Sequence, residues 1–220
     1  GSSSTRAVAQ LVLLDNKFST LPRVLAEGRR VINNIERVAN LFITKAAYAV
    51  LLTALIGIAG SPFPFLPRQL TLIGTFSIGV PGFFLALAPN EALVRPGFLT
   101  RVLRFSIPAG AVAGTTTFVL YEIVRRMDDV TLPEARTAAT ATLLFLGLVT
   151  LLLISRPWQP WKAGLAAAMA ACYVLVMVWS TARDYFELDL PPGGAWIAVG
   201  IASIIGAAGL WLSTRVFTND

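Results

Sequence analysis

The sequence has no histidine, only one cysteine and few charged residues. Without histidine it lacks the commonest transition-metal ligand and the usual proton shuttle. Cys172 stands alone, so no disulfide can form within the chain. Only 14% of the residues are charged and 55% are hydrophobic, whereas soluble domains carry about 25% charged residues. This balance indicates a membrane protein.

Sequence motifs for catalysis are also missing. The sequence shows no glycine-rich phosphate loop, no metal-ligand spacing and no nucleophile next to a base. We therefore assign no catalytic residue, and any metal-ligand set is left open. The formal charge is +6, but the basic residues form no patch interleaved with aromatic residues in a soluble region, which argues against nucleic-acid binding.

Apolar stretches recur along the chain, each close to the roughly 20 residues that a helix needs to cross the hydrocarbon core. We expect spans at 39–59, 70–88, 105–124, 137–155, 163–182 and 195–214. The predicted fold class is therefore an all-α transmembrane bundle of six helices in a lipid bilayer. Small residues are dense in the third, fifth and sixth spans, which favours close helix packing.

The connections between the spans differ in charge. The N-terminal segment, the loops at 89–104 and 156–162 and the C-terminus carry most of the basic residues, whereas the alternate connections carry most of the acids. By the positive-inside rule, both ends of the chain are predicted to be cytoplasmic. We therefore expect a multi-pass protein of the plasma membrane.

The first 38 residues differ from the rest. The apolar run 7–15 predicts a buried strand, and a helix is expected to begin with Ser19 as its N-cap. No strong stop follows until about Ile58, and Val31, Ile35, Val38 and Phe42 keep one apolar stripe along the helix. Because a single strand needs partners, we expect its sheet to lie upstream. The expected divisions are 1–38, 39–215 and a tail at 216–220.

The second span is interrupted near its centre by Gly79, Pro81 and Gly82. One interpretation is a helix that unwinds around Pro81 and directs the hydroxyls of Thr75 and Ser77, with freed carbonyls, into the bundle, as in the discontinuous helices of transporters. The other is a proline kink whose carbonyls are satisfied by neighbours.

Polar residues in the first two spans complete the candidate pathway: Thr44, Lys45, Tyr48 and Thr71 join Thr75, Ser77 and Pro81. Lys45 lies about 9 Å along the helix from Ala39. It either snorkels to the cytoplasmic surface or acts inside the bundle as a counter-charge or gate. Neither span contains an acidic residue, so no carboxylate cage for a hard divalent cation is visible.

The first 42 residues also carry a long family pattern. The stretch "AVAQLVLLDNKFSTLPRVLAEGRRVINNIERVANLF" resembles the exit from the HAD-like phosphorylation domain of P-type cation-transporting ATPases. The matching positions are Val12, Leu13, Leu14, Asp15, Phe18, Ser19, Glu27, Gly28, Arg29, Asn34 and Ile35. The later stretches "GVPGFFLALAPN" and "RPGFLTRVLRFSIPAG" resemble an actinobacterial branch whose mycobacterial member is associated with calcium uptake.

The resemblance implies that residues 1–38 are a strand and stalk helix of that domain and that the six spans are the family's fifth to tenth transmembrane helices. The phosphorylated aspartate and the sites for ATP and Mg²⁺ would lie upstream, in domains of the same polypeptide that act as partners of this chain. The transported cation would be Ca²⁺.

The resemblance also shows where the chain departs from better-known calcium pumps. Their sixth helix carries Asn, Thr and Asp where this chain has Gly74, Ser77 and Ile78, so only the serine could bind a cation. Ile43 and Ala46 stand where the fifth helix would carry Asn and Glu. A polyamine, a monovalent cation or a lipid is therefore an alternative cargo. A non-enzymatic membrane module is the alternative from another class of protein.

Overall fold

The computed structural model describes residues 7–10, 12, 17–90, 92–94, 96–155 and 159–218. Within this part of the chain the fold is helical, with no strand, and six helical segments are long and apolar enough to cross a membrane. This confirms the predicted all-α architecture. The named elements are η1 (Phe18–Thr20), α2 (Leu21–Ala59), α3 (Pro67–Gly74), η2 (Thr75–Gly79), α4 (Val80–Leu87), α5 (Phe98–Val124), α6 (Leu132–Ile154), α7 (Pro160–Val178), α8 (Ser180–Tyr185) and α9 (Gly193–Thr218).

The strand predicted at 7–15 is wrong where it can be compared. Ala7 and Val8 are helical, and Ala9, Gln10 and Val12 are irregular. The remaining positions of the run lie outside the described residues. A strand is stable only when its backbone groups pair with a neighbour, and no strand occurs among the described residues to pair with it.

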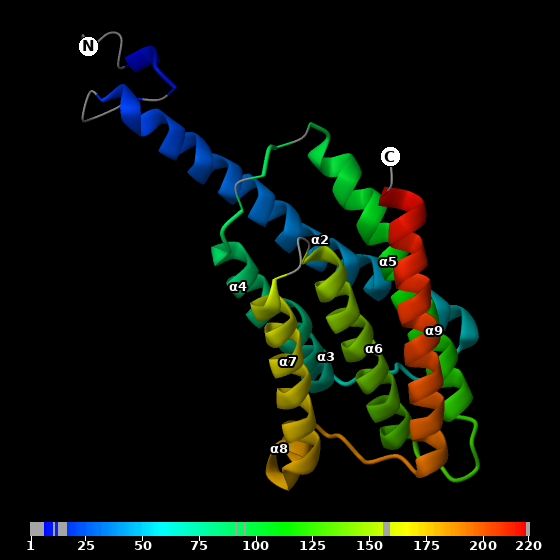
Figure 1. Ribbon diagram of the computed structural model, residues 1–220. Helices are drawn as coiled ribbons and strands as arrows, with labels where there is room; N and C mark the ends of the chain where they lie inside the picture. The colour runs from blue at the N-terminus through cyan, green and yellow to red at the C-terminus, as the bar shows by residue number, and fades with distance from the viewer. Residues whose placement is uncertain are drawn as a thin grey trace.

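Helix α2 is the longest element. It runs without interruption through 39 residues, a length of about 58 Å at 1.5 Å per residue, and its N-terminal part projects beyond the bundle (Figure 1). Pro22 is tolerated in the first turn because the backbone N–H groups there have no helical partner. Ser19 is not the N-cap, as it lies in η1, and Thr20 precedes α2. Gly60 ends the helix with a positive φ of 65°.

The closest helix pair is formed by α2 and α5. Gly110 and Gly114 are spaced four residues apart on α5, the spacing that lets membrane helices approach at small residues. A Cβ atom at Gly110 would lie 2.4 Å from the Ala47 Cβ and 2.9 Å from the Thr44 carbonyl oxygen. Only glycine therefore fits at this crossing, which fixes the face that α2 turns toward the bundle.

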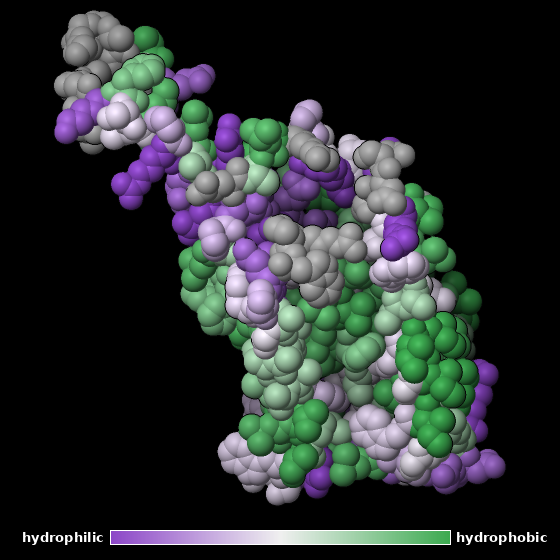
Figure 2. All heavy atoms as spheres, in the orientation of Figure 1, coloured by the Kyte–Doolittle hydropathy of each residue, from purple (hydrophilic) through white to green (hydrophobic). Residues whose placement is uncertain are grey.

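The outer surface of the bundle suits a bilayer. Large apolar side chains such as Val50, Ile58, Val178 and Ile204 are at least 70% exposed. Figure 2 shows hydrophobic residues dominating the middle of the visible face and hydrophilic residues gathering toward both ends. The N-terminal end of α2 and the C-terminal end of α9 lie at the same end of the bundle (Figure 1). That end, from which the N-terminal part of α2 projects, is called the stalk end below, and the opposite one the far end.

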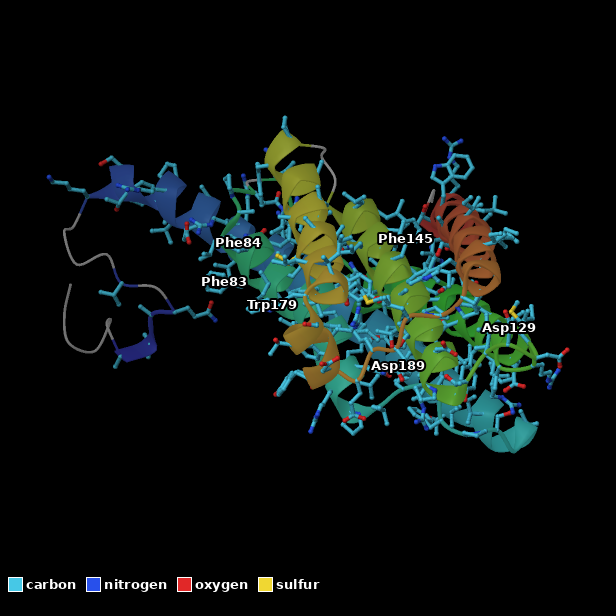
Figure 3. All side chains as sticks on the ribbon, turned by 90° about the horizontal axis from the view of Figure 1, so that it is seen from below. Phe83, Phe84, Asp129, Phe145, Trp179 and Asp189 are labelled. Atoms are coloured by element: carbon cyan, nitrogen blue, oxygen red, sulfur yellow. The ribbon has the colours of Figure 1, made fainter. Side chains whose placement is uncertain are left out.

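The fifth span is shorter than predicted. Helix α7 ends at Val178, and Trp179 has an extended backbone with ψ 107° before the short helix α8 begins. The predicted span 163–182 therefore contains a bend at Trp179. Trp179 projects from this junction on the same side of the bundle as Phe83 and Phe84 of α4 (Figure 3), whose rings make an edge-to-face contact at 5.6 Å between centroids.

We expect the Gly110→Ala variant to be less stable than the wild type by about 1–3 kcal/mol, because the added methyl group would press on the backbone of α2. The apparent melting temperature in detergent is the measurement. Gly164→Ala is the matched control, since a Cβ at Gly164 meets nothing within 4 Å. Equal melting temperatures for Gly110→Ala and the wild type would contradict the crossing.

Candidate ion pathway

The interrupted second span is widened rather than unwound. Residues Thr75–Gly79 form a π-helical turn between α3 and α4, and the Val80 N–H donates to the Thr75 carbonyl five residues earlier. Pro81, in the first turn of α4, has no N–H to donate, and its ring would crowd the Ser77 carbonyl in a regular α-helix. The π turn removes that conflict one turn before the proline. Such turns are frequent at functional sites.

Ser77 lies in this turn and faces helix α6. Its side chain is 2% exposed, and its hydroxyl donates to the Ile73 carbonyl at 2.6 Å. A Cβ at Gly147 would lie 2.7 Å from the Ser77 Cβ and 3.1 Å from its Oγ. The serine oxygen, which can still accept a hydrogen bond, is therefore held against α6 in the centre of the bundle.

A small cavity of about 10 Å³ lies beside Ser77, close to the volume that one water molecule needs. Polar side chains reach it from three elements: Thr44 and Tyr48 from α2, Ser77 from η2 and Thr150 from α6. The Thr150 hydroxyl donates to the Leu146 carbonyl at 2.9 Å. The Thr44 hydroxyl is buried without a hydrogen-bond partner among the described residues, which is a costly arrangement unless a bound group completes it.

The other candidates lie outside this cavity. Lys45, Thr71 and Thr75 line an open groove of about 370 Å³ between α2 and the α3–η2 segment. The Lys45 Nζ is 3.1 Å from the position that a Cβ at Gly74 would occupy. The seven predicted residues thus separate into three groups: Thr44, Tyr48 and Ser77 at the cavity, Lys45, Thr71 and Thr75 in the groove, and Pro81 in neither.

Helix α2 also holds the end of α4. The Asn34 side-chain amide donates to the carbonyls of Ala86 at 3.0 Å and Ala88 at 2.7 Å, and Arg30 donates to the Leu87 carbonyl at 3.3 Å. The last carbonyls of a helix have no partner within the helix. The stalk helix supplies those partners, so α2 and α4 are joined at the stalk end.

The far end of the interrupted span is fixed as well. Gln69, which is fully buried, donates from its amide to the Glu187 carbonyl at 2.9 Å and accepts from the Leu66 N–H at 3.0 Å. Arg68 pairs with the Glu187 carboxylate at 3.2 Å and donates to the Tyr185 carbonyl at 3.0 Å. The interrupted span is thus held at both ends, with the π turn between them.

Sequence reasoning missed the contributions of α6 and of the stalk. Thr150 and Gly147 lie in a span that is apolar on all sides, so no periodic pattern marks the face they share. Asn34 was noted as a family position, but its sequence context gave no sign that it would bind α4. Thr117, from the run Thr115–Thr117, is buried without a hydrogen-bond partner among the described residues, yet it does not line the cavity.

Comparison with known proteins identifies relatives of this chain. No family model matches the chain. The chain is 44% identical to the calcium-transporting ATPase CtpE of Mycolicibacterium smegmatis, in a match that covers 100% of this chain and 30% of the relative. It is 43% identical to CtpE of Mycobacterium tuberculosis, over 98% of this chain and 29% of the relative. The chain is related to the P-type cation-transporting ATPases.

A third relative of this chain is less similar to it. The probable cation-transporting ATPase exp7 of Streptococcus pneumoniae is 39% identical over 50% of this chain. The chain spans about 30% of the length of the mycobacterial relatives it matches. The similarity therefore concerns one part of these ATPases, and the six helices of the fold agree with a membrane-embedded part.

We expect Asn34→Ala to weaken the junction between α2 and α4, because two carbonyls of α4 would lose their partner, at a cost of about 1–3 kcal/mol. Hydrogen exchange of residues 83–90 in the purified protein should become faster. Asn33→Ala is the control, since Asn33 donates only to the Ala92 carbonyl in the following loop. Unchanged exchange in Asn34→Ala would show that these hydrogen bonds do not hold α4.

Proposed function

We propose that this chain is the membrane part of an ATP-driven cation pump, and that the pump transports Ca²⁺. The observation that carries the proposal is the unpartnered Thr44 hydroxyl, which faces a water-sized cavity beside the π turn of the interrupted span. The names of the mycobacterial relatives support Ca²⁺ as the cargo. Hydroxyl oxygens are hard ligands that suit such a cation.

The cavity supplies only part of a calcium site. Ca²⁺ takes about 6–8 oxygen ligands, usually with carboxylates among them, and no acidic side chain lines this cavity. Gly74 and Ile78, which stand at family ligand positions, carry no oxygen in their side chains. We infer that the missing ligands come from other helices of the same polypeptide, and that Thr44 and Ser77 contribute from this side.

Coupling to ATP hydrolysis is proposed to run through α2. Residues 1–38 would belong to the end of a HAD-like phosphorylation domain and its stalk, and 39–215 to the membrane domain. A movement of the stalk would reach the cavity at Thr44 through a continuous helix, and α4 through Asn34. ATP and Mg²⁺ would bind elsewhere in the pump.

The proposed orientation puts the stalk end in the cytoplasm. The start of α2 and the end of α9 lie at that end of the bundle (Figure 1), and the basic loops favour the cytoplasmic side of a plasma membrane. The far end, where Asp129 and Asp189 lie in the connections before α6 and α9 (Figure 3), would then face outward.

The first test removes the hydroxyl at the cavity. In the full-length pump, Thr44→Val should raise the Ca²⁺ concentration for half-maximal ATP hydrolysis about tenfold, equivalent to about 1.4 kcal/mol of lost binding, while Thr44→Ser should stay near the wild type. Thr53→Val is the control on the same helix, because the Thr53 hydroxyl is exposed and bonds only the Ala49 carbonyl. An unchanged calcium dependence in Thr44→Val would exclude Thr44 from the pathway.

The second test concerns the π turn. Pro81→Ala restores a backbone N–H, so a regular α-helix can replace the π turn and rotate Ser77 away from α6. We expect lower calcium-stimulated ATP hydrolysis with little loss of folded protein. Unchanged turnover and calcium affinity would contradict a role for the turn.

The cargo itself is decided by transport into vesicles. The full-length pump should accumulate Ca²⁺ in an ATP-dependent way. Transport of spermidine, a monovalent cation or labelled lipid instead of Ca²⁺ would support an ATP-driven pump with a different cargo. The absence of any ATP-dependent transport would favour a non-enzymatic membrane module.

A further inference from the structure

Lys45 carries a charge that the described residues leave uncompensated. Its side chain is half-buried, and no hydrogen bond or ion pair joins it to another described residue. Two acidic side chains on the packed helices already have partners: Glu36 on α2 pairs with Arg101 at 2.6 Å, and Glu122 on α5 pairs with Arg125 and Arg126 at 2.9 Å each. A lone ammonium group within a membrane span is expensive, and such groups usually have a partner.

The ammonium group lies deep in the span. Its Nζ is beside Gly74, the eighth residue of the 21-residue segment Pro67–Leu87. At 1.5 Å per residue this level is about 10 Å from the far end of the segment and about 20 Å from the stalk end. Lys45 therefore does not reach back to the stalk end. Lipid phosphates stay outside a hydrocarbon core about 30 Å thick, so they are poorly placed to neutralise it.

The groove around Lys45 forms part of a longer groove along α2. It continues toward the stalk end as a second groove of about 440 Å³ lined by Val31, Ile35 and Val38, and Phe42 borders both. From Val31 to Lys45 the two grooves follow α2 for about 21 Å. Val31, Ile35 and Phe42 are 47%, 54% and 55% exposed, although they form one apolar stripe of the kind that a packed helix buries.

We propose that a membrane helix from the remainder of the same polypeptide, continued beyond the bilayer beside the stalk part of α2, occupies the two grooves and pairs an Asp or Glu side chain with Lys45. The inference rests on the proposed function, in which this chain is one part of a longer pump. Three observations select this occupant: the uncompensated charge, the exposed apolar stripe that continues from it, and relatives of which this chain spans about 30%. The pair is a structural partnership that persists whichever cargo the pump carries.

The first experiment identifies the occupant in the full-length protein. A benzophenone amino acid replaces Thr71, an exposed residue of the groove wall, and the illuminated protein is analysed by peptide mapping. We expect a cross-link to a membrane segment outside these 220 residues that contains an Asp or Glu. The same probe at Ile204, which is 70% exposed on α9, is the control. Cross-links from position 71 to lipid alone, or to a segment without an acid, would overturn the proposal.

The second experiment tests the charge pair by thermal unfolding of the same protein. Lys45→Met should lower the apparent melting temperature by at least about 3 °C, because a carboxylate would be left unpaired, and Lys45→Arg should preserve it. Lys45→Met combined with the amide variant of the cross-linked acid should recover the wild-type value. If Lys45 has no partner, Lys45→Met will be neutral or stabilising. Neither readout depends on transport, so a failed calcium assay leaves this test decisive.

Discussion

The backbones of α2 and α5 meet at Gly110, and that contact fixes the positions of the candidate residues on α2. Since the glycine leaves no space for a Cβ, α2 can present only one face to the bundle there. Thr44 and Tyr48 lie on that face and reach the cavity. Lys45 is the next residue after Thr44, so its side chain points in a different direction from α2, into the open groove beside α3 and η2. A single close crossing thus separates the hydroxyl groups from the ammonium group.

The interrupted span obeys a second constraint, which is that backbone polar groups inside a bilayer need partners. The π turn keeps its residues helical while it makes room for Pro81. Asn34 and Arg30 satisfy the carbonyls at one end of the span, and Gln69 joins the other end to the loop at Glu187. The hydrogen bonds that join this span to other elements therefore lie at its two ends, and the π turn lies between them.

Much of the fold follows from the sequence because membrane spans leave a strong signal. Long apolar runs predicted six spans, and the described structure contains six such helices. The strand at 7–15 was wrong where it can be compared, since apolar character alone cannot replace a missing strand partner. The break at Trp179 was also missed. Both errors concern contacts that local composition does not encode.

The candidate site was less predictable. The sequence named Thr44, Tyr48 and Ser77, but it could not show that Lys45, Thr71 and Thr75 lie in a different place, because the crossing at Gly110 decides which face of α2 is inside. The uniform apolarity of α6 hid Thr150. These residues become a group only when distant helices are brought together.

The crossing at Gly110 also divides α2 into two lever arms of unequal length. Thr44 touches it and divides the helix into an arm of about 35 Å toward Leu21 and one of about 22 Å toward Ala59, at 1.5 Å per residue. Any tilt about this fulcrum would swing the two tips in opposite directions, with the longer arm travelling about one and a half times as far. A force applied at Leu21 would act with a mechanical advantage on Ala59. The residues beside the crossing would rotate but would hardly be displaced.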